Sequence, residues 1–153
     1  MDKCFEFKRR TKMRIVIGGA YNGKRNFVAK TLRHRNQKNV YQYEGEIPKA
    51  SFTKDDIVII GSLENVIIKS DNLDEDDIAK QIFDELKELD VQTNLICICT
   101  DIGRGIVPLE KNERKLRDAC GRLYQRLFSE SSEIVRVWYG IPQYIKGEKW
   151  DYE

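Results

Sequence analysis

The stretch MRIVIGGAYNGKRNFVAKTLR, residues 13–33, decides the fold. It begins with the β-branched run MRIVI, which is typical of a buried strand, and it continues after the glycines as a helix over residues 24–33. Between the two, Gly18, Gly23 and Lys24 fit the pattern G-x-x-x-x-G-K. Such a loop directs backbone N–H groups toward a phosphate, and its lysine reaches the outer phosphates. The pattern therefore predicts a strand, loop and helix that bind a nucleotide.

Seven loop residues form the predicted nucleotide-binding set: Gly18, Gly19, Ala20, Asn22, Gly23, Lys24 and Arg25. A tight turn that only needs the backbone freedom of glycine is the competing interpretation, and the strand–loop–helix context favours the phosphate site over it.

The metal-binding part of the motif is altered. A complete motif has Ser or Thr after the lysine, and its hydroxyl binds Mg²⁺. Arg25 stands there instead, and a guanidinium cannot coordinate a cation. A second metal-holding acid is expected at the end of another core strand, but the run DIVII is followed by Gly61 and Ser62. The nearest acids are Glu64 and Asp101, so we expect a weakened metal site, assign no metal ligand and leave a requirement for Mg²⁺ open.

The rest of the chain alternates between buried strands and amphipathic helices. This alternation predicts an α/β fold, a mainly parallel sheet with helices on both faces. The predicted strands cover residues 56–60, 95–99 and 133–139, with an edge strand near 40–43, and the predicted helices cover residues 71–89 and 112–129. We expect an N-terminal extension over residues 1–12, a single domain over 13–146 and a polar tail over 147–153.

Composition excludes several classes of protein. The 153 residues are 41% hydrophobic and 34% charged, which indicates one globular domain. The net charge of +2 does not indicate a nucleic-acid-binding surface. No apolar run approaches the roughly 20 residues that span a bilayer, and the charged N-terminus is not followed by the apolar stretch of a signal peptide. We therefore expect a cytoplasmic protein that binds neither membrane nor nucleic acid.

Cysteines and aromatic residues are interpreted as parts of the packing. Three cysteines, Cys97, Cys99 and Cys120, are expected as buried reduced thiols, and a single histidine cannot complete a Cys/His zinc site. Trp138 alternates with its neighbours in the last predicted strand and is expected to pack inside. The aromatic residues of the C-terminal region are too scattered to predict a stacking platform; they are Trp138, Tyr139, Trp150 and Tyr152.

Three segments carry a resemblance to a known family. They are TDIGRGIVP at residues 100–108, RKLRDACGRLYQRL at 114–127 and EIVRVWYGIPQYIK at 133–146. With the glycine-rich loop, they resemble the cobinamide kinase/cobinamide-phosphate guanylyltransferase family from about Met13 to Lys146. The resemblance implies a P-loop NTPase-like fold, GTP or ATP as the bound nucleotide, a cobinamide as a partner and a homo-oligomer. That family phosphorylates adenosylcobinamide, forms a guanylylated histidine and transfers GMP to the cobinamide phosphate.

The resemblance makes Lys24, His34 and Asp101 the candidate catalytic residues. It departs from the family at Arg25, which replaces the loop serine, and at Gly61, which replaces an acid. The segment before DIVII is also shorter, and that segment normally carries the family's histidine. His34 lies ten positions after Lys24. It either corresponds to the family's histidine or is an exposed residue at the end of the helix, and we favour the second interpretation.

Two functional hypotheses compete with the enzyme. One is a non-catalytic relative that binds a nucleotide or a corrinoid and serves a regulatory or partner-binding role. The other is a metal-independent phosphate-binding protein with an unrelated partner. The altered metal positions count against full bifunctional activity, whereas the well-matched TDIGRGIVP loop counts against wholesale loss of function.

Overall fold

The computed structural model describes residues 12–19, 23–33, 39–70, 74–101 and 111–147, and in them six strands form one sheet. The order across the sheet is β2-β3-β4-β1-β5-β6. Neighbours are parallel except β5 and β6, which are antiparallel. The strands are β1 (Arg14–Gly18), β2 (Val40–Glu44), β3 (Ile57–Gly61), β4 (Asn94–Thr100), β5 (Glu133–Trp138) and β6 (Ile141–Lys146).

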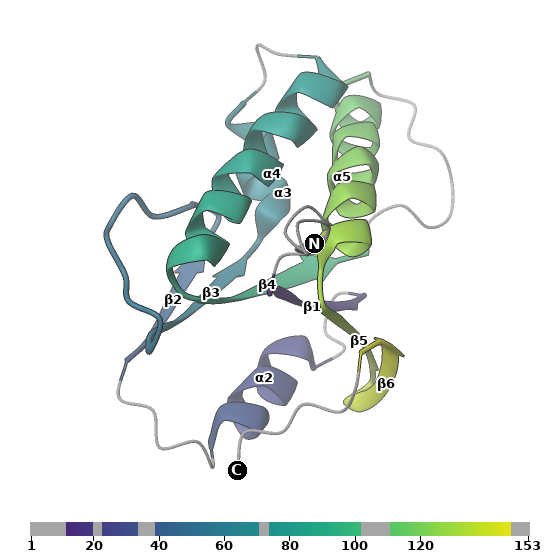
Figure 1. Cartoon of the computed structure of the whole chain (residues 1–153). Helices are drawn as coiled ribbons and strands as arrows, with labels where there is room; N and C mark the ends of the chain where they lie inside the picture. Colours follow the sequence, from purple (N-terminus) through teal and green to yellow (C-terminus); the bar gives the residue numbers. More distant parts are fainter. Residues whose placement is uncertain (1–11, 20–22, 34–38, 71–73, 102–110, 148–153) are drawn as a thin grey trace, which may run out of the picture.

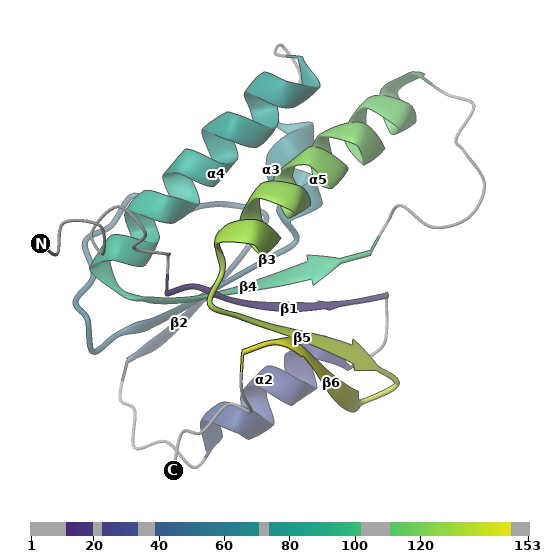
Figure 2. The ribbon, with the colours of Figure 1, turned by 45° about the vertical axis from the view of Figure 1, so that its right-hand side comes forward.

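Helices cover both faces of this sheet, as predicted. One face carries α2 (Lys24–Arg33), and the other carries α3 (Leu63–Ile68), α4 (Glu75–Gln92) and α5 (Lys111–Glu130) (Figures 1 and 2). Residues of β3 alternate between the two faces, because side chains of a strand point to opposite sides. Val58 and Ile60 pack with the three-helix layer, whereas Ile57 and Ile59 pack with Val28 of α2. The fold is therefore α/β, of the kind expected for P-loop proteins.

The carboxyl ends of the parallel strands meet at one edge of the sheet. Gly18 at the end of β1 is in register with Thr100 at the end of β4, and Glu44 at the end of β2 is in register with Gly61. After β1 the chain forms α2 on one face, whereas α5, which follows β4, lies on the other. Such a divergence opens a crevice at the carboxyl edge, where ligands of open α/β sheets bind.

Most predicted elements are confirmed, with boundary shifts of one to three residues in most cases. The helix predicted from residue 71 instead begins at Glu75 and runs to Gln92. Its start is fixed by Asp74, whose carboxylate accepts a hydrogen bond of 2.8 Å from the backbone N–H of Asp77. This side-chain cap satisfies one of the free N–H groups at the helix start. Residues 71–73 and residues 102–108 of the TDIGRGIVP segment lie outside the described residues.

Two elements, α3 and β6, were not predicted. β6 contains Pro142, a residue unfavourable within a sheet, but β6 is the last strand of the sheet, where a missing N–H is tolerated. The prediction that Trp138 packs inside is wrong. Trp138 ends β5 at the turn into this edge strand, and 59% of its surface is exposed.

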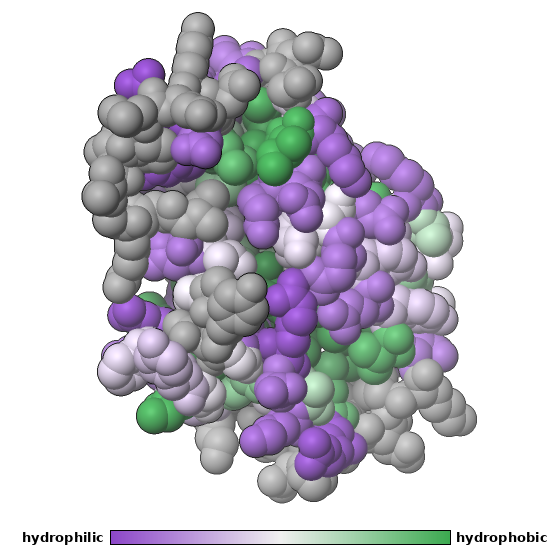
Figure 3. All heavy atoms as spheres, turned by 180° about the vertical axis from the view of Figure 1, so that it is seen from behind, coloured by the Kyte–Doolittle hydropathy of each residue, from purple (hydrophilic) through white to green (hydrophobic). Residues whose placement is uncertain are grey.

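The three cysteines are free and buried, as predicted. Burial raises the pKa of each thiol, to about 12 for Cys120, so they are unreactive core residues. On the face opposite that of Figure 1, hydrophilic side chains prevail and hydrophobic ones form separate patches (Figure 3). Among the described helices, none combines the length and the hydropathy that a membrane span requires.

Candidate functional site

Lys24 is the first residue of α2 and is almost completely buried, with 4% of the residue exposed. Its ammonium Nζ donates hydrogen bonds to the backbone oxygens of Gly18, at 3.1 Å, and Gly19, at 2.7 Å. Burial lowers the pKa of Lys24, and the neighbouring Arg25 guanidinium lowers it further. The lysine is thus held at the mouth of the loop, where an incoming anion could replace the two carbonyl groups.

Two of the loop glycines are required by their surroundings. A Cβ on Gly18 would lie 2.4 Å from the backbone oxygen of Val137 in β5. Gly23 has a φ of +88° and packs against Gly140, whose Cα would be 3.3 Å from an added Cβ. Gly18 is needed because the backbone of β5 approaches it closely, and Gly23 is needed for its positive φ and its contact with the β5–β6 turn. These requirements are consistent with a simple tight turn as well as with a phosphate-binding loop.

Of the predicted nucleotide-binding set, five residues come together at the start of α2: Gly18, Gly19, Gly23, Lys24 and Arg25. Ala20 and Asn22 lie outside the described residues. The first helical hydrogen bond runs from the N–H of Phe27 to the oxygen of Gly23, at 2.9 Å. The N–H groups of residues 24–26 precede that bond and so have no partner within the helix. They point to the same end of α2 as the buried lysine.

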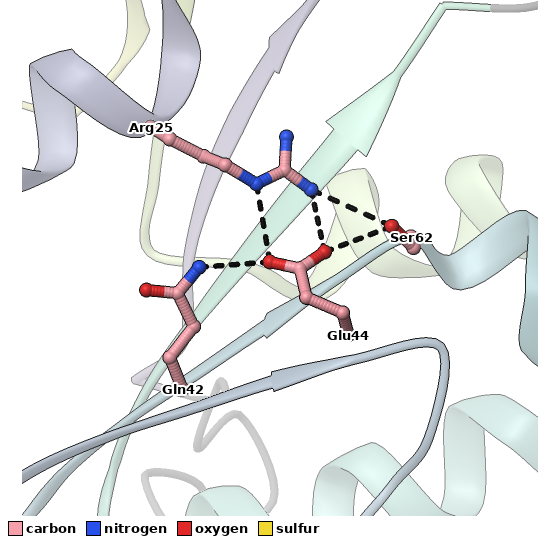
Figure 4. A network of polar contacts seen from close by, with 4 residues as sticks. All are labelled: Arg25, Gln42, Glu44 and Ser62. Atoms are coloured by element: carbon pink, nitrogen blue, oxygen red, sulfur yellow. Dashed lines mark hydrogen bonds and ion pairs between the residues drawn. The ribbon is translucent and has the colours of Figure 1, made fainter.

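Arg25 is bound to a carboxylate that the sequence did not bring to attention, Glu44 at the end of β2 (Figure 4). Arg25 donates from Nη2 to Oε1 of Glu44 at 2.6 Å, and from Nε to Oε2 at 3.1 Å. This two-bond geometry is the strongest form of the arginine–carboxylate pair. Gln42 donates to Oε2 at 2.8 Å, and the hydroxyl of Ser62 donates to Oε1 at 2.8 Å.

The pair shifts the titration of both partners. The hydrogen bond from Arg25 holds the pKa of Glu44 at about 2, below its ordinary 4.5, although partial burial opposes the shift. The hydrogen bond to Glu44 raises the pKa of Arg25. Both groups therefore stay charged from mildly acidic pH upward. The pair links α2 to β2, and through Ser62 to the end of β3.

Gly61 leaves the space that this pair fills. A Cβ at Gly61 would lie 2.7 Å from Oε1 of Glu44 and 2.8 Å from Nη2 of Arg25. Contacts this short do not occur with real side chains unless a neighbour moves, so a side chain at this position would require the ends of Arg25 and Glu44 to shift. Where the resembled family has a serine and an acid, this chain has two mutually compatible changes, Arg25 and Gly61.

The two other acids named from the sequence lie near the loop. Asp101 directly follows β4, and its N–H donates to the oxygen of Gly18 at 3.0 Å. Glu64, in the first turn of α3, has one carboxylate oxygen, Oε1, that is buried without a hydrogen-bond partner among the described residues. Its charge raises the pKa of Lys24, against the effect of burial. Within the described part of the chain, no three His, Cys, Asp or Glu side chains converge as a metal site would require.

His34 follows directly on Arg33, the last residue of α2, and lies outside the described residues. The helix is continuous from Lys24 to Arg33, so nine steps of about 1.5 Å carry its end about 14 Å from the loop. The structure thus groups Lys24 with Asp101 and does not bring the end of α2 to them.

Comparison with known families supports the resemblance seen in the sequence. The model of the family described as cobinamide kinase / cobinamide phosphate guanyltransferase matches residues 48–145, more than half of the chain. No curated protein matches the sequence. The matched range includes Gly61, Glu64 and Asp101, whereas the loop with Lys24 and Arg25 precedes it.

We predict that the Arg25–Glu44 pair makes stability depend on acid pH. Because the folded-state pKa of Glu44 lies below its ordinary value, its contribution is complete above about pH 4.5 and is lost as the pH falls toward 2. Both side chains are more than 40% exposed, so we expect no more than about 1 kcal/mol. Urea unfolding of Glu44→Gln and of the native protein should differ by more at pH 6 than at pH 3.

The exposed Glu46→Gln is the matched control for this measurement. A difference between Glu44→Gln and the native protein that stays constant between the two pH values would show that the ion pair does not form in solution.

Proposed function

The chain belongs to the cobinamide kinase / cobinamide phosphate guanyltransferase family, and we propose that it binds a nucleoside triphosphate, GTP or ATP, at the loop from Gly18 to Arg25. The reaction we propose is the kinase half of the family's activity, in which the terminal phosphoryl group passes to a cobinamide. The observation that carries this proposal is the buried Lys24, held by two loop carbonyls at the start of α2.

The electrostatics of the loop support binding of an anion. A buried ammonium without a counter-ion is unfavourable, and carbonyl oxygens are only partial compensation. A phosphate oxygen would form a charge-assisted hydrogen bond with Lys24, and such bonds are about twice as strong as neutral ones. The N–H groups of residues 24–26, which have no partner within α2, and the dipole of α2 add to the attraction. The bound triphosphate would therefore rest on the loop with its outer phosphates at Lys24.

We further propose that this binding depends little on Mg²⁺. The family's serine hydroxyl and strand-end acid are both replaced, and the guanidinium of Arg25 lies beside Gly61, close to where that acid would be. The residues present do not fit the family's metal site, since arginine has no lone pair to offer a cation. Arg25 carries a positive charge one residue after Lys24 that is paired with Glu44, and a triphosphate that drew the guanidinium away from this carboxylate would gain part of the charge that a metal otherwise provides.

A non-catalytic role is the second candidate, and one observation favours it. The Arg25–Glu44 pair lies beside Gly61, where the resemblance places a metal-holding acid, and phosphoryl transfer depends strongly on the charges placed around the transferred group. A protein with this change could retain nucleotide binding and lose turnover. Incubation of the protein with labelled triphosphate and cobinamide distinguishes the two: labelled cobinamide phosphate indicates the kinase, and binding without product indicates the non-catalytic relative.

We predict that Lys24→Met weakens triphosphate binding by roughly 10- to 100-fold, because a hydrogen bond to a charged group contributes about 1.5–3 kcal/mol. Methionine keeps the apolar stem of the side chain and so limits the effect on packing. Isothermal titration calorimetry with GTP and ATP measures the change, and the exposed Lys30→Met on the same helix is the control. Equal affinities for the native protein and Lys24→Met would exclude the loop as the binding site.

We predict that the chain does not form a guanylylated histidine. In-line attack on the α-phosphate needs an imidazole beside the nucleotide, whereas the continuous α2 ends about 14 Å from the loop. Incubation with GTP, followed by mass spectrometry of the intact protein, should show no added GMP in a sample that binds the nucleotide. A GMP adduct that is absent from His34→Asn would contradict this prediction and identify a working guanylyltransferase.

A further inference from the structure

A cavity of about 330 Å³ opens directly beside the glycine-rich loop, on the three-helix side of the sheet. Gly18, Gly19 and Asp101 form its end next to the loop. Arg136 and Trp138, which alternate along β5, line it together with Ile145 of β6. Its volume lies at the lower end of the roughly 300–1,000 Å³ of small-molecule sites. A ligand that rests on the loop could therefore extend into this cavity.

The turn between β5 and β6 is packed against the loop. Gly140 in this turn lies next to Gly23, and the backbone oxygen of Val137 approaches Gly18. Trp138 is paired with Ile141, so the turn consists of Tyr139 and Gly140. Their φ angles are +48° and +81°. Positive φ at both central residues is the geometry that suits a two-residue hairpin, but it is unfavourable for tyrosine. The turn thus holds a strained aromatic residue beside the candidate phosphate site.

The two aromatic side chains of this hairpin are largely in solvent. Trp138 is 59% exposed and Tyr139 is 72% exposed, and their ring centroids lie 5.4 Å apart at an angle of 63°. Ile141 and Ile145 of β6 are also more than half exposed. An exposed apolar patch beside a cavity is typical of a binding surface, and backbone strain at Tyr139 is typical of functional sites.

Arg136 adds a polar group to the cavity. It is only partly exposed, and its guanidinium makes no hydrogen bond or ion pair with another residue among those that the structure describes. A guanidinium in partly apolar surroundings is stabilised by an acceptor that a ligand can supply. A sugar oxygen or the phosphate nearest to the sugar would serve.

We propose that this cavity binds the nucleoside part of the nucleotide, with the base stacked on Trp138 and the sugar or its phosphate hydrogen-bonded to Arg136. This rests on the proposed triphosphate binding at Lys24. Stacking on an aromatic side chain accepts any base, because every base has a π-face. The cavity suits a nucleoside better than a corrin ring, which is much larger. Under this proposal, the β5–β6 hairpin, and not the three-helix layer, is the reason that the protein binds a nucleotide more tightly than an inorganic phosphate compound.

The test compares nucleotides with inorganic tripolyphosphate, which has the charges and lacks the base. In Trp150→Phe, Trp138 is the only remaining tryptophan, since the chain has two. GTP or ATP should change its fluorescence, and tripolyphosphate should not. Trp138→Leu should weaken nucleotide binding roughly tenfold through loss of stacking, leave tripolyphosphate binding unchanged, and be largely rescued by Trp138→Phe. Tyr41→Leu, at the opposite edge of the sheet, is the matched control.

Each result decides between the two proposals. If Lys24→Met weakens nucleotide binding and Trp138→Leu does not, the base lies elsewhere, and the triphosphate site stands without this inference. If Trp138→Leu weakens nucleotide and tripolyphosphate equally, the variant disturbs the loop and the stacking proposal fails. If the native protein binds neither compound, the proposed function fails, and this inference fails with it.

Discussion

The ion pair between Arg25 and Glu44 is the interaction that connects the elements around the candidate site. It joins the first turn of α2 to the end of β2, and Ser62 ties it to the end of β3. Gly61 is compatible with the pair because it has no Cβ, and a larger residue would require the ends of the Arg25 and Glu44 side chains to shift. Under the proposed function, the arginine and the glycine that stand where the resembled family has a serine and an acid belong to one arrangement, in which an internal ion pair takes the place of groups suited to Mg²⁺.

The sheet brings these residues together from distant parts of the chain. Parallel strands place their carboxyl ends at one edge, so the loop after β1, Glu44, Gly61 and Asp101 all lie along that edge. The turn after β5 completes the row, with Gly140 against Gly23. One end of the row holds the ion pair, and the other holds the aromatic hairpin. The buried Lys24 lies between them. In the proposed complex, the triphosphate binds at Lys24 near the ion pair, and the base extends toward the aromatic hairpin.

The sequence predicted the parts of this arrangement that are local. The strand, loop and helix around Lys24 carry their own pattern, and the longer helices have clear hydrophobic periodicity. Glu44 was not recognised as a site residue, because its contact with Arg25 depends on the register of β2 against β3, which no local pattern encodes. The only indication in the sequence was that Gln42 and Glu44 are two residues apart at a predicted edge strand, which places both polar side chains on one face. The six residues of α3 are too few to show a helical periodicity. β6 was not predicted because it contains Pro142, and a proline is tolerated there only because β6 lies at the edge of the sheet.

The most direct test of the central claim is the dependence of triphosphate affinity on Mg²⁺, measured by calorimetry with excess Mg²⁺ and with EDTA. If the ion pair has replaced the metal site, the native protein should bind with nearly equal affinity under both conditions. The double variant Arg25→Ser/Gly61→Asp, which restores the family's residue types, should depend on Mg²⁺ more strongly. A native protein that binds triphosphate only with Mg²⁺ would contradict the account and would indicate that Glu64 or Asp101 has rebuilt the metal site.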